Sequence, residues 1–143
     1  MKISEVIGRK PDQKVVTIGP DATVRDLLAL LAEHNIGAVV VSSDGTTVEG
    51  IVSERDVVRR LHGHEEALGS PVRDIMTAAV HTAASTDPLD AVRSVMTQRR
   101  FRHVPIVDDG RLVGIVSIGD VVKAHIDQIE FERDQLDSYV RQT

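Results

Sequence analysis

Cysteine and tryptophan are absent from this chain of 143 residues, and its only aromatic residues are Phe101, Phe131 and Tyr139. Without cysteine there can be no disulfide, no thiolate nucleophile and no cysteine-based zinc site. The net charge of −5 and the scarcity of rings leave little to neutralise a phosphate backbone or to stack on bases. A nucleic-acid partner is therefore not expected.

Long apolar runs are also missing. The longest ones, such as residues 38–41, are far too short to cross a bilayer, and residues 1–10 lack the apolar core of a signal peptide. Hydrophobic residues make up 41% and charged residues 27%, which is typical of a folded globular protein. We therefore predict no membrane partner and a cytoplasmic location.

One short motif occurs twice. Residues 50–56 read GIVSERD, and residues 114–120 read GIVSIGD. The similarity is wider than these segments, because residues 15–41 align with residues 80–106. A single copy of about sixty residues would bury only roughly 60% of its unfolded surface. The two copies are therefore expected to pack face to face.

Each copy is predicted as strand, helix, strand, strand, helix, which gives an α+β fold. Turns with Asp44-Gly45 and Asp109-Gly110 join the last two strands of each copy, and Asp-Gly is a strong hairpin signal. The predicted boundaries are 1–62 for the first repeat, 63–77 for the join and the start of the second repeat, 78–127 for the second repeat, and 128–143 for a C-terminal helix extension.

The first helix of each copy has a recognisable start. Thr23 with Asp26 three residues later predicts a capping box. In the second copy, Asp87 is predicted as the N-cap and Pro88 as the first helical residue.

The repeated motif allows two interpretations. Ser53 and Ser117 would be helix N-caps, with Asp56 and Asp120 at the third helical position, and this purely structural role explains the pattern. The same geometry also suits a ligand, because a helix N-terminus binds phosphate and a carboxylate accepts from ribose hydroxyls. A purine would then rest on aliphatic side chains, since no aromatic residue is placed to stack on it.

The repeat resembles the cystathionine-β-synthase-type (CBS) domain, and the whole chain resembles a stand-alone tandem pair, often called a Bateman module. The resemblance rests on the element order, on HNIGAVVV and RFRHVPIV after each first helix, and on GIVSERD and GIVSIGD before each second helix. It covers roughly residues 1–127 and implies a pseudo-twofold pair with two clefts between the repeats.

The resemblance also implies a ligand class and a set of contacts. Such clefts often bind AMP, ADP, ATP, NAD(H) or S-adenosylmethionine, and no resident cofactor is required. Carried over by position, the nucleotide-binding residues would be Thr17, Gly37, Ala38, Ser53, Arg55, Asp56, Thr82, Arg102, His103, Pro105, Ser117 and Asp120.

The two clefts are expected to be unequal. Arg102 and His103 would reach phosphates in the Asp56 cleft, whereas their counterparts for the Asp120 cleft are Gly37 and Ala38. The Asp56 cleft is therefore predicted to prefer the more phosphorylated ligand. The alternative is that Arg102 and His103 belong to a solvated basic patch.

No catalytic or metal site is predicted. The segment His62-Gly63-His64-Glu65-Glu66 carries metal-ligand residue types, but a surface loop explains it better. His34, His81 and His125 are scattered and are interpreted as ordinary surface or helix-end residues. Neither serine of the motif has the nucleophile elbow of a hydrolase, and Rossmann and Walker motifs are absent, so an enzyme is not expected.

The C-terminal segment continues a helical pattern beyond the second repeat. Apolar residues recur with spacings of 4, 3, 7 and 4, and Arg133 interrupts the stripe, which consists of Val122, Ile126, Ile129, Leu136 and Val140. Such a seam favours contact with another chain, and a homodimer is predicted.

The leading functional hypothesis is a regulatory module that senses energy or redox state through an adenosine nucleotide and acts on an unidentified partner protein. The alternative is a protein-interaction or structural module with unoccupied clefts.

Overall fold

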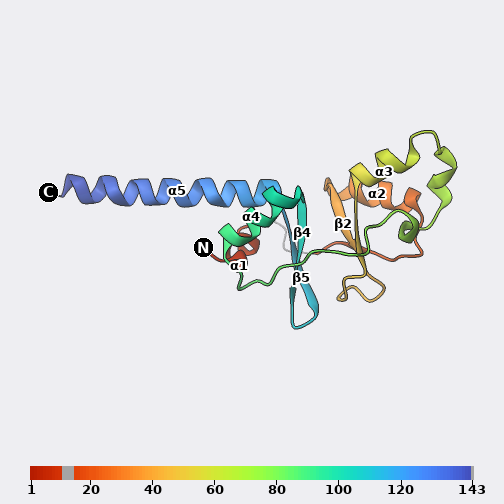
Figure 1. The fold of residues 1–143 in the computed structure, drawn as a ribbon, viewed down its shortest axis with the longest axis horizontal. Coiled ribbons are helices and arrows are strands. Elements are labelled where there is room, and N and C mark those ends of the chain that lie inside the picture. The colour runs from red at the N-terminus through yellow and green to blue at the C-terminus, as the bar shows by residue number, and fades with distance from the viewer. Residues whose placement is uncertain (11–14, 143) are drawn as a thin grey trace.

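The computed structural model describes residues 1–10 and 15–142. Two lobes of mixed helix and strand lie side by side, and a long helix leaves the body and ends at the C-terminus (Figure 1). This is the predicted α+β arrangement of two repeats with a C-terminal helix.

The first lobe contains a three-stranded sheet covered by helices. The middle strand β2 pairs in parallel with β1 and antiparallel with β3. The elements are β1 (Thr17–Ile18), α2 (Val24–His34), β2 (Ala38–Val41), β3 (Gly50–Ser53) and α3 (Glu54–Leu61), followed by the short 3₁₀ helices η1 (Glu65–Gly69) and η2 (Val72–Asp74).

The second lobe repeats this order with a smaller sheet. Its first strand is reduced to one parallel bridge between Ala83 and Ile106. Asp109 and Gly110 both have positive φ and form the predicted two-residue hairpin turn. The elements are α4 (Leu89–Arg99), β4 (His103–Asp108), β5 (Arg111–Ser117) and α5 (Ile118–Arg141), together with the N-terminal helix α1 (Ile3–Gly8).

The hydrophobic cores do not follow the order of the sequence. Ile3 and Val6 of α1 are buried in the core of the second repeat, among residues of α4, β4, β5 and α5. Val72 and Ile75, which follow the first repeat, are buried in the core of that first repeat. Each lobe is therefore completed by the segment that precedes the other repeat in sequence. The repeat boundaries predicted at residues 62 and 77 remain predictions.

Backbone hydrogen bonds show that this exchange is symmetric. Near the start of α4, the N–H of Leu89 donates to the carbonyl oxygen of Met1 at 2.9 Å, and at the start of α2 the N–H of Val24 donates to Ser70 at 2.9 Å. The first N–H groups of a helix have no partner within the helix, so these bonds satisfy groups that the repeat cannot satisfy itself. Residues of α1 thus correspond to residues 69 positions later.

The predicted helix starts are confirmed with one exception. The capping box of Thr23 and Asp26 is present. In the second repeat the N-cap is Pro88, so the assignment of Asp87 as N-cap was wrong by one residue. The Asp87 carboxylate instead accepts from the Ala84 N–H at 2.9 Å, which fixes the turn before the helix.

Helix α5 is the longest element. Only its first part is packed, with Val121 and Ala124 buried, and residues 130–142 are all exposed. Within the described residues, no helix combines the length and apolar character needed to span a membrane.

The exchanged segments fit closely against glycines. A Cβ at Gly50 would lie 2.5 Å from Met76 Sδ and 3.0 Å from the carbonyl oxygen of Thr77. Gly50→Ala should therefore lower the free energy of unfolding by about 1–3 kcal/mol, as overpacking does elsewhere. Urea denaturation measures this, with Gly69→Ala as the control, because a Cβ at Gly69 would meet no atom within 4 Å beyond its chain neighbours. Equal stability of the two variants would contradict the close packing.

Candidate functional site

Each repeat has a serine and an aspartate at the junction between its last strand and last helix. The Ser53 hydroxyl accepts from the Asp56 N–H, and the Asp56 carboxylate accepts from the Ser53 N–H at 2.9 Å. Ser117 and Asp120 form the same box, with the Ser117 N–H 2.9 Å from the Asp120 carboxylate. The structural interpretation of the repeated motif is thus confirmed, and both carboxylates are only partly buried.

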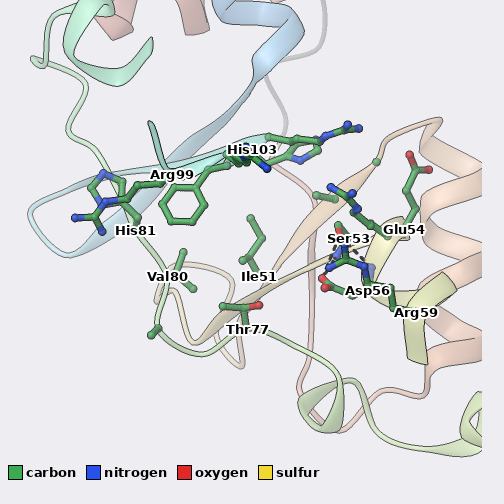
Figure 2. A pocket seen from close by; sticks show the side chains of 17 residues that line it. Ile51, Ser53, Glu54, Asp56, Arg59, Thr77, Val80, His81, Arg99 and His103 are labelled. Carbon is green, nitrogen blue, oxygen red and sulfur yellow. Dashed lines mark hydrogen bonds between the residues drawn. The ribbon is translucent and has the colours of Figure 1, made fainter. Parts of the chain in front are cut away.

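The first cleft lies at the Ser53–Asp56 junction and has a volume of about 380 Å³. Ser53, Glu54, Asp56 and Arg59 lie on one side in Figure 2, and His103 with the segment before α4 lies opposite. It is lined by residues 37–38, Ile51, residues 53–56, Arg59, Thr77, residues 79–81 and residues 99–103.

The second cleft lies at the Ser117–Asp120 junction and has a volume of about 490 Å³. It is lined by Lys10, Val16, residues 34–38, His103, Ile115, Ser117 and Asp120. The two clefts therefore use equivalent positions of the two repeats.

Most of the residues predicted from the sequence line one cleft or the other. Those in the Asp56 cleft are Ser53, Arg55, Asp56 and Arg102, those in the Asp120 cleft are Ser117 and Asp120, and those in both are Gly37, Ala38 and His103. The structure does not bring three of the predicted residues into either lining: Thr17, which lies in β1, Thr82, and Pro105, which is buried in β4.

His103 lies between the two clefts. The sequence placed it in the Asp56 cleft alone, but its side chain also lines the Asp120 cleft, opposite Gly37. Burial lowers the pKa of His103 below its ordinary value of 6.5 and outweighs the carboxylates of Asp120 and Glu54, which act in the other direction.

The prediction of an aliphatic pocket with a polar end was wrong for the first cleft, whose lining includes aromatic rings. His81 and Phe101 both line it, and their rings are stacked with centroids 5.9 Å apart. At the equivalent positions the second cleft has Val16 and Ile36. The sequence did not predict the pair because Phe101 aligned with the aliphatic Ile36 and His81 was interpreted as a surface residue.

The charge of the two linings also differs. The first cleft carries two carboxylates, Glu54 and Asp56, and five arginines, which are Arg55, Arg59, Arg99, Arg100 and Arg102. In the second cleft, Lys10 Nζ lies 3.0 Å from Asp120 Oδ2. Burial raises the pKa of Asp120, but hydrogen bonds from Ser117 and Lys10 together hold it below its ordinary value.

The histidine-rich join contains one close pair of metal-ligand residue types. His64 Nδ1 lies 3.3 Å from Glu66 Oε1, and both side chains are exposed. Across residues 1–10 and 15–142 there is no group of three His, Cys, Asp or Glu residues arranged to hold a metal ion.

Comparison with known proteins identifies the repeats. The pattern of the CBS domain matches residues 3–63 and 72–127. The chain is 33% identical over 147 residues to the mitochondrial CBS domain-containing protein CBSX3 of Arabidopsis thaliana, a match that covers 97% of this chain and 71% of that protein.

Solved structures show the same fold. The CBS-domain containing protein ATU1752 of Agrobacterium tumefaciens is 42% identical with a TM-score of 0.81, over 87% of this chain and 99% of that one. The structure of CBSX2 in complex with AMP is 29% identical with a TM-score of 0.75, over 90% of this chain and 98% of that one.

The half-buried position of His103 predicts a pH dependence of stability. As the pH falls below about 6.5, the unfolded chain takes up a proton at this residue before the folded chain does, so the free energy of unfolding decreases. His103→Asn should lose less stability than the wild type between about pH 7.5 and about pH 5.5 in thermal unfolding. His62→Asn, at an exposed position, is the control and should behave as the wild type. An unchanged loss in His103→Asn would contradict the lowered pKa.

Proposed function

Because this chain belongs to the CBS domain family, we propose that it is a regulatory module that binds an adenosine nucleotide in a cleft between its two repeats. The observation that carries the proposal is the lining of the Asp56 cleft. A half-buried carboxylate at a helix N-terminus lies there with a stacked aromatic pair and five arginines. The bound AMP in the related CBSX2 structure supports the ligand class.

Each part of the nucleotide has a matching group in this cleft. Ribose hydroxyls would donate to the Asp56 carboxylate, and the adenine ring would lie against the face presented by His81 and Phe101, since aromatic pairs prefer offset or edge contacts. Phosphates would meet Arg102 and its neighbours, because guanidinium groups form strong charge-assisted hydrogen bonds with phosphate oxygens. Residues Thr17, Thr82 and Pro105 would act only indirectly, through the backbone that carries the lining.

The excess of arginine favours a ligand with more than one phosphate in the Asp56 cleft. Of the candidates AMP, ADP, ATP, NAD(H) and S-adenosylmethionine, the first four carry phosphate, and ADP, ATP and NAD(H) carry at least two. The module would therefore respond to energy or redox state. The solvated-patch alternative for Arg102 predicts that its removal leaves nucleotide affinity unchanged.

Regulation requires a ligand that binds two states unequally and a partner that distinguishes them. The partner that responds to the bound state would be another protein. The chain itself would not catalyse a reaction. A cytoplasmic location is part of the same proposal. The second candidate function is an interaction module with unoccupied clefts, for which the exposed apolar residues of α5 are the supporting observation.

A thermal-shift panel with AMP, ADP, ATP, NAD(H) and S-adenosylmethionine separates these functions. Ligand at a hundred times its dissociation constant stabilises by about 2.7 kcal/mol, so ATP should raise the unfolding midpoint of the wild type by several degrees. Arg102→Ala should bind ATP about tenfold more weakly in calorimetry, because a hydrogen bond to a charged group contributes about 1.5–3 kcal/mol.

Arg111→Ala is the matched control, since Arg111 is exposed in the β4–β5 hairpin and lines neither cleft. No shift with any ligand would support the interaction module instead. Equal ATP affinity of Arg102→Ala and the wild type would refute the phosphate contact, and turnover assays on the same ligands test for catalysis.

A homodimer through α5 is the second part of the proposal. Val122, Ile126, Ile129 and Leu136 recur along one side of the helix, and between 47% and 65% of each is exposed in the single chain. With Arg133 included, the spacing is 4, 3, 4, 3, which is the heptad pattern of a coiled-coil seam. A polar residue at one seam position would fix the register of the two helices.

Charged substitutions in the seam test the dimer. The double variant Ile129→Glu, Leu136→Glu should run as a monomer in light scattering, because the seam would have to bury four carboxylates per dimer. The variant Gln135→Glu, Ser138→Glu adds the same charge outside the seam and should remain a dimer. A monomeric wild type would rule out this use of α5.

A further inference from the structure

The Asp120 cleft contains its own cation. Lys10 Nζ lies 3.0 Å from Asp120 Oδ2 and donates to the carbonyl oxygen of Ile115 at 2.9 Å. The side chains of Lys10 and Asp120 are only 28% and 26% exposed, so solvent screens this pair less than a surface pair. The neighbouring Arg9 also contacts α5, 3.6 Å from Asp127. The end of α1 is thus tied to the helix that carries Asp120.

The Asp56 cleft has no cation at the position equivalent to Lys10. Ile7 of α1 packs against Gly114, as Met76 packs against Gly50, which gives the same correspondence of residues 69 positions apart as the hydrogen bonds of Met1 and Ser70. The counterpart of Lys10 is therefore Ala79, which lines the Asp56 cleft with a methyl group. The pair of Lys10 and Asp120 is a property of one cleft only.

The two carboxylates therefore differ in what a ribose would meet. Asp56 Oδ2 is 3.1 Å from the Ser53 hydroxyl, a neutral group that can rotate toward an incoming ligand. Asp120 is neutralised by an ammonium that has a second hydrogen bond of its own. Ribose hydroxyls would have to displace a charged donor to reach Asp120, and charge-assisted hydrogen bonds are the stronger ones.

We infer that the Lys10 ammonium is the occupant of the second cleft, because it takes the position on Asp120 that ribose hydroxyls would take. The chain therefore binds one nucleotide, in the Asp56 cleft. This inference rests on the proposed function for the nucleotide in the Asp56 cleft. Lys10 then sets the number of nucleotides bound per chain, although it lies outside the repeated motif.

Calorimetry on the full chain tests the inference. The wild type should bind one ATP per chain. In an Asp56→Asn background, which disables the first cleft, adenosine should bind at least about tenfold more weakly than in the variant that also carries Lys10→Ala. That binding should disappear again with Asp120→Asn. Lys10→Arg in the same background keeps the charge and should behave like Asp56→Asn alone.

The outcomes separate this inference from the proposed function. Two ATP per chain in the wild type, or no gain of adenosine binding on Lys10→Ala, would overturn the role of Lys10. A wild type that binds no nucleotide, together with adenosine binding by the Lys10→Ala, Asp56→Asn variant, would refute the Asp56 site and support Lys10 as the occupant. The urea midpoint of each variant shows whether it is folded. The stoichiometry of ATP binding is measured on the wild type, so that result does not depend on any variant.

Discussion

The exchange of segments between the repeats is the constraint on which the rest of the structure depends. A repeat of about sixty residues has too little core of its own, and here the N-terminal helix completes the second lobe while the join completes the first. The N–H groups of Val24 and Leu89 are satisfied by carbonyls from the exchanged segments. Neither lobe can therefore be complete without the other part of the chain, and this fixes the two strand–helix junctions relative to each other.

The junctions themselves combine two tasks that local physics makes compatible. Serine and aspartate close each capping box, which settles the start of α3 and α5. A capping box leaves the helix dipole pointing into the cleft and leaves a carboxylate at its edge. The structural and the ligand-binding interpretations of the motif are thus not alternatives, because a residue that caps the helix is placed where a ligand would lie.

Local patterns in the sequence predicted the element order, the Asp109-Gly110 turn and three of the four helix starts. These features depend on residues three or four apart, which a single segment displays. The start of α4 was missed because the Asp87 carboxylate accepts from the Ala84 N–H in the preceding turn and does not cap the helix. The contact of Lys10 with Asp120 was missed because it joins the N-terminal segment to the second repeat, and only the exchange brings these together. The aromatic pair of His81 and Phe101 was missed because its members lie twenty residues apart, on segments that the bridge between Ala83 and Ile106 brings together.

The two repeats share their element order, and the segments before their first strands make the two clefts differ. The residues shared by both repeats build the helix caps, so a change there would damage the fold of one lobe. The residues before each first strand carry no such duty: His81 stands where the first repeat has Val16, and Ala79 stands where the N-terminal segment has Lys10. Lys10 and Ala79 line a cleft and belong to neither hydrophobic core, so the charge at this position can differ without a change in core packing. Differences in ligand preference between the two clefts are therefore expected to arise in the segments before the first strands. A single repeat taken by itself would not show this, because these segments contact the other repeat.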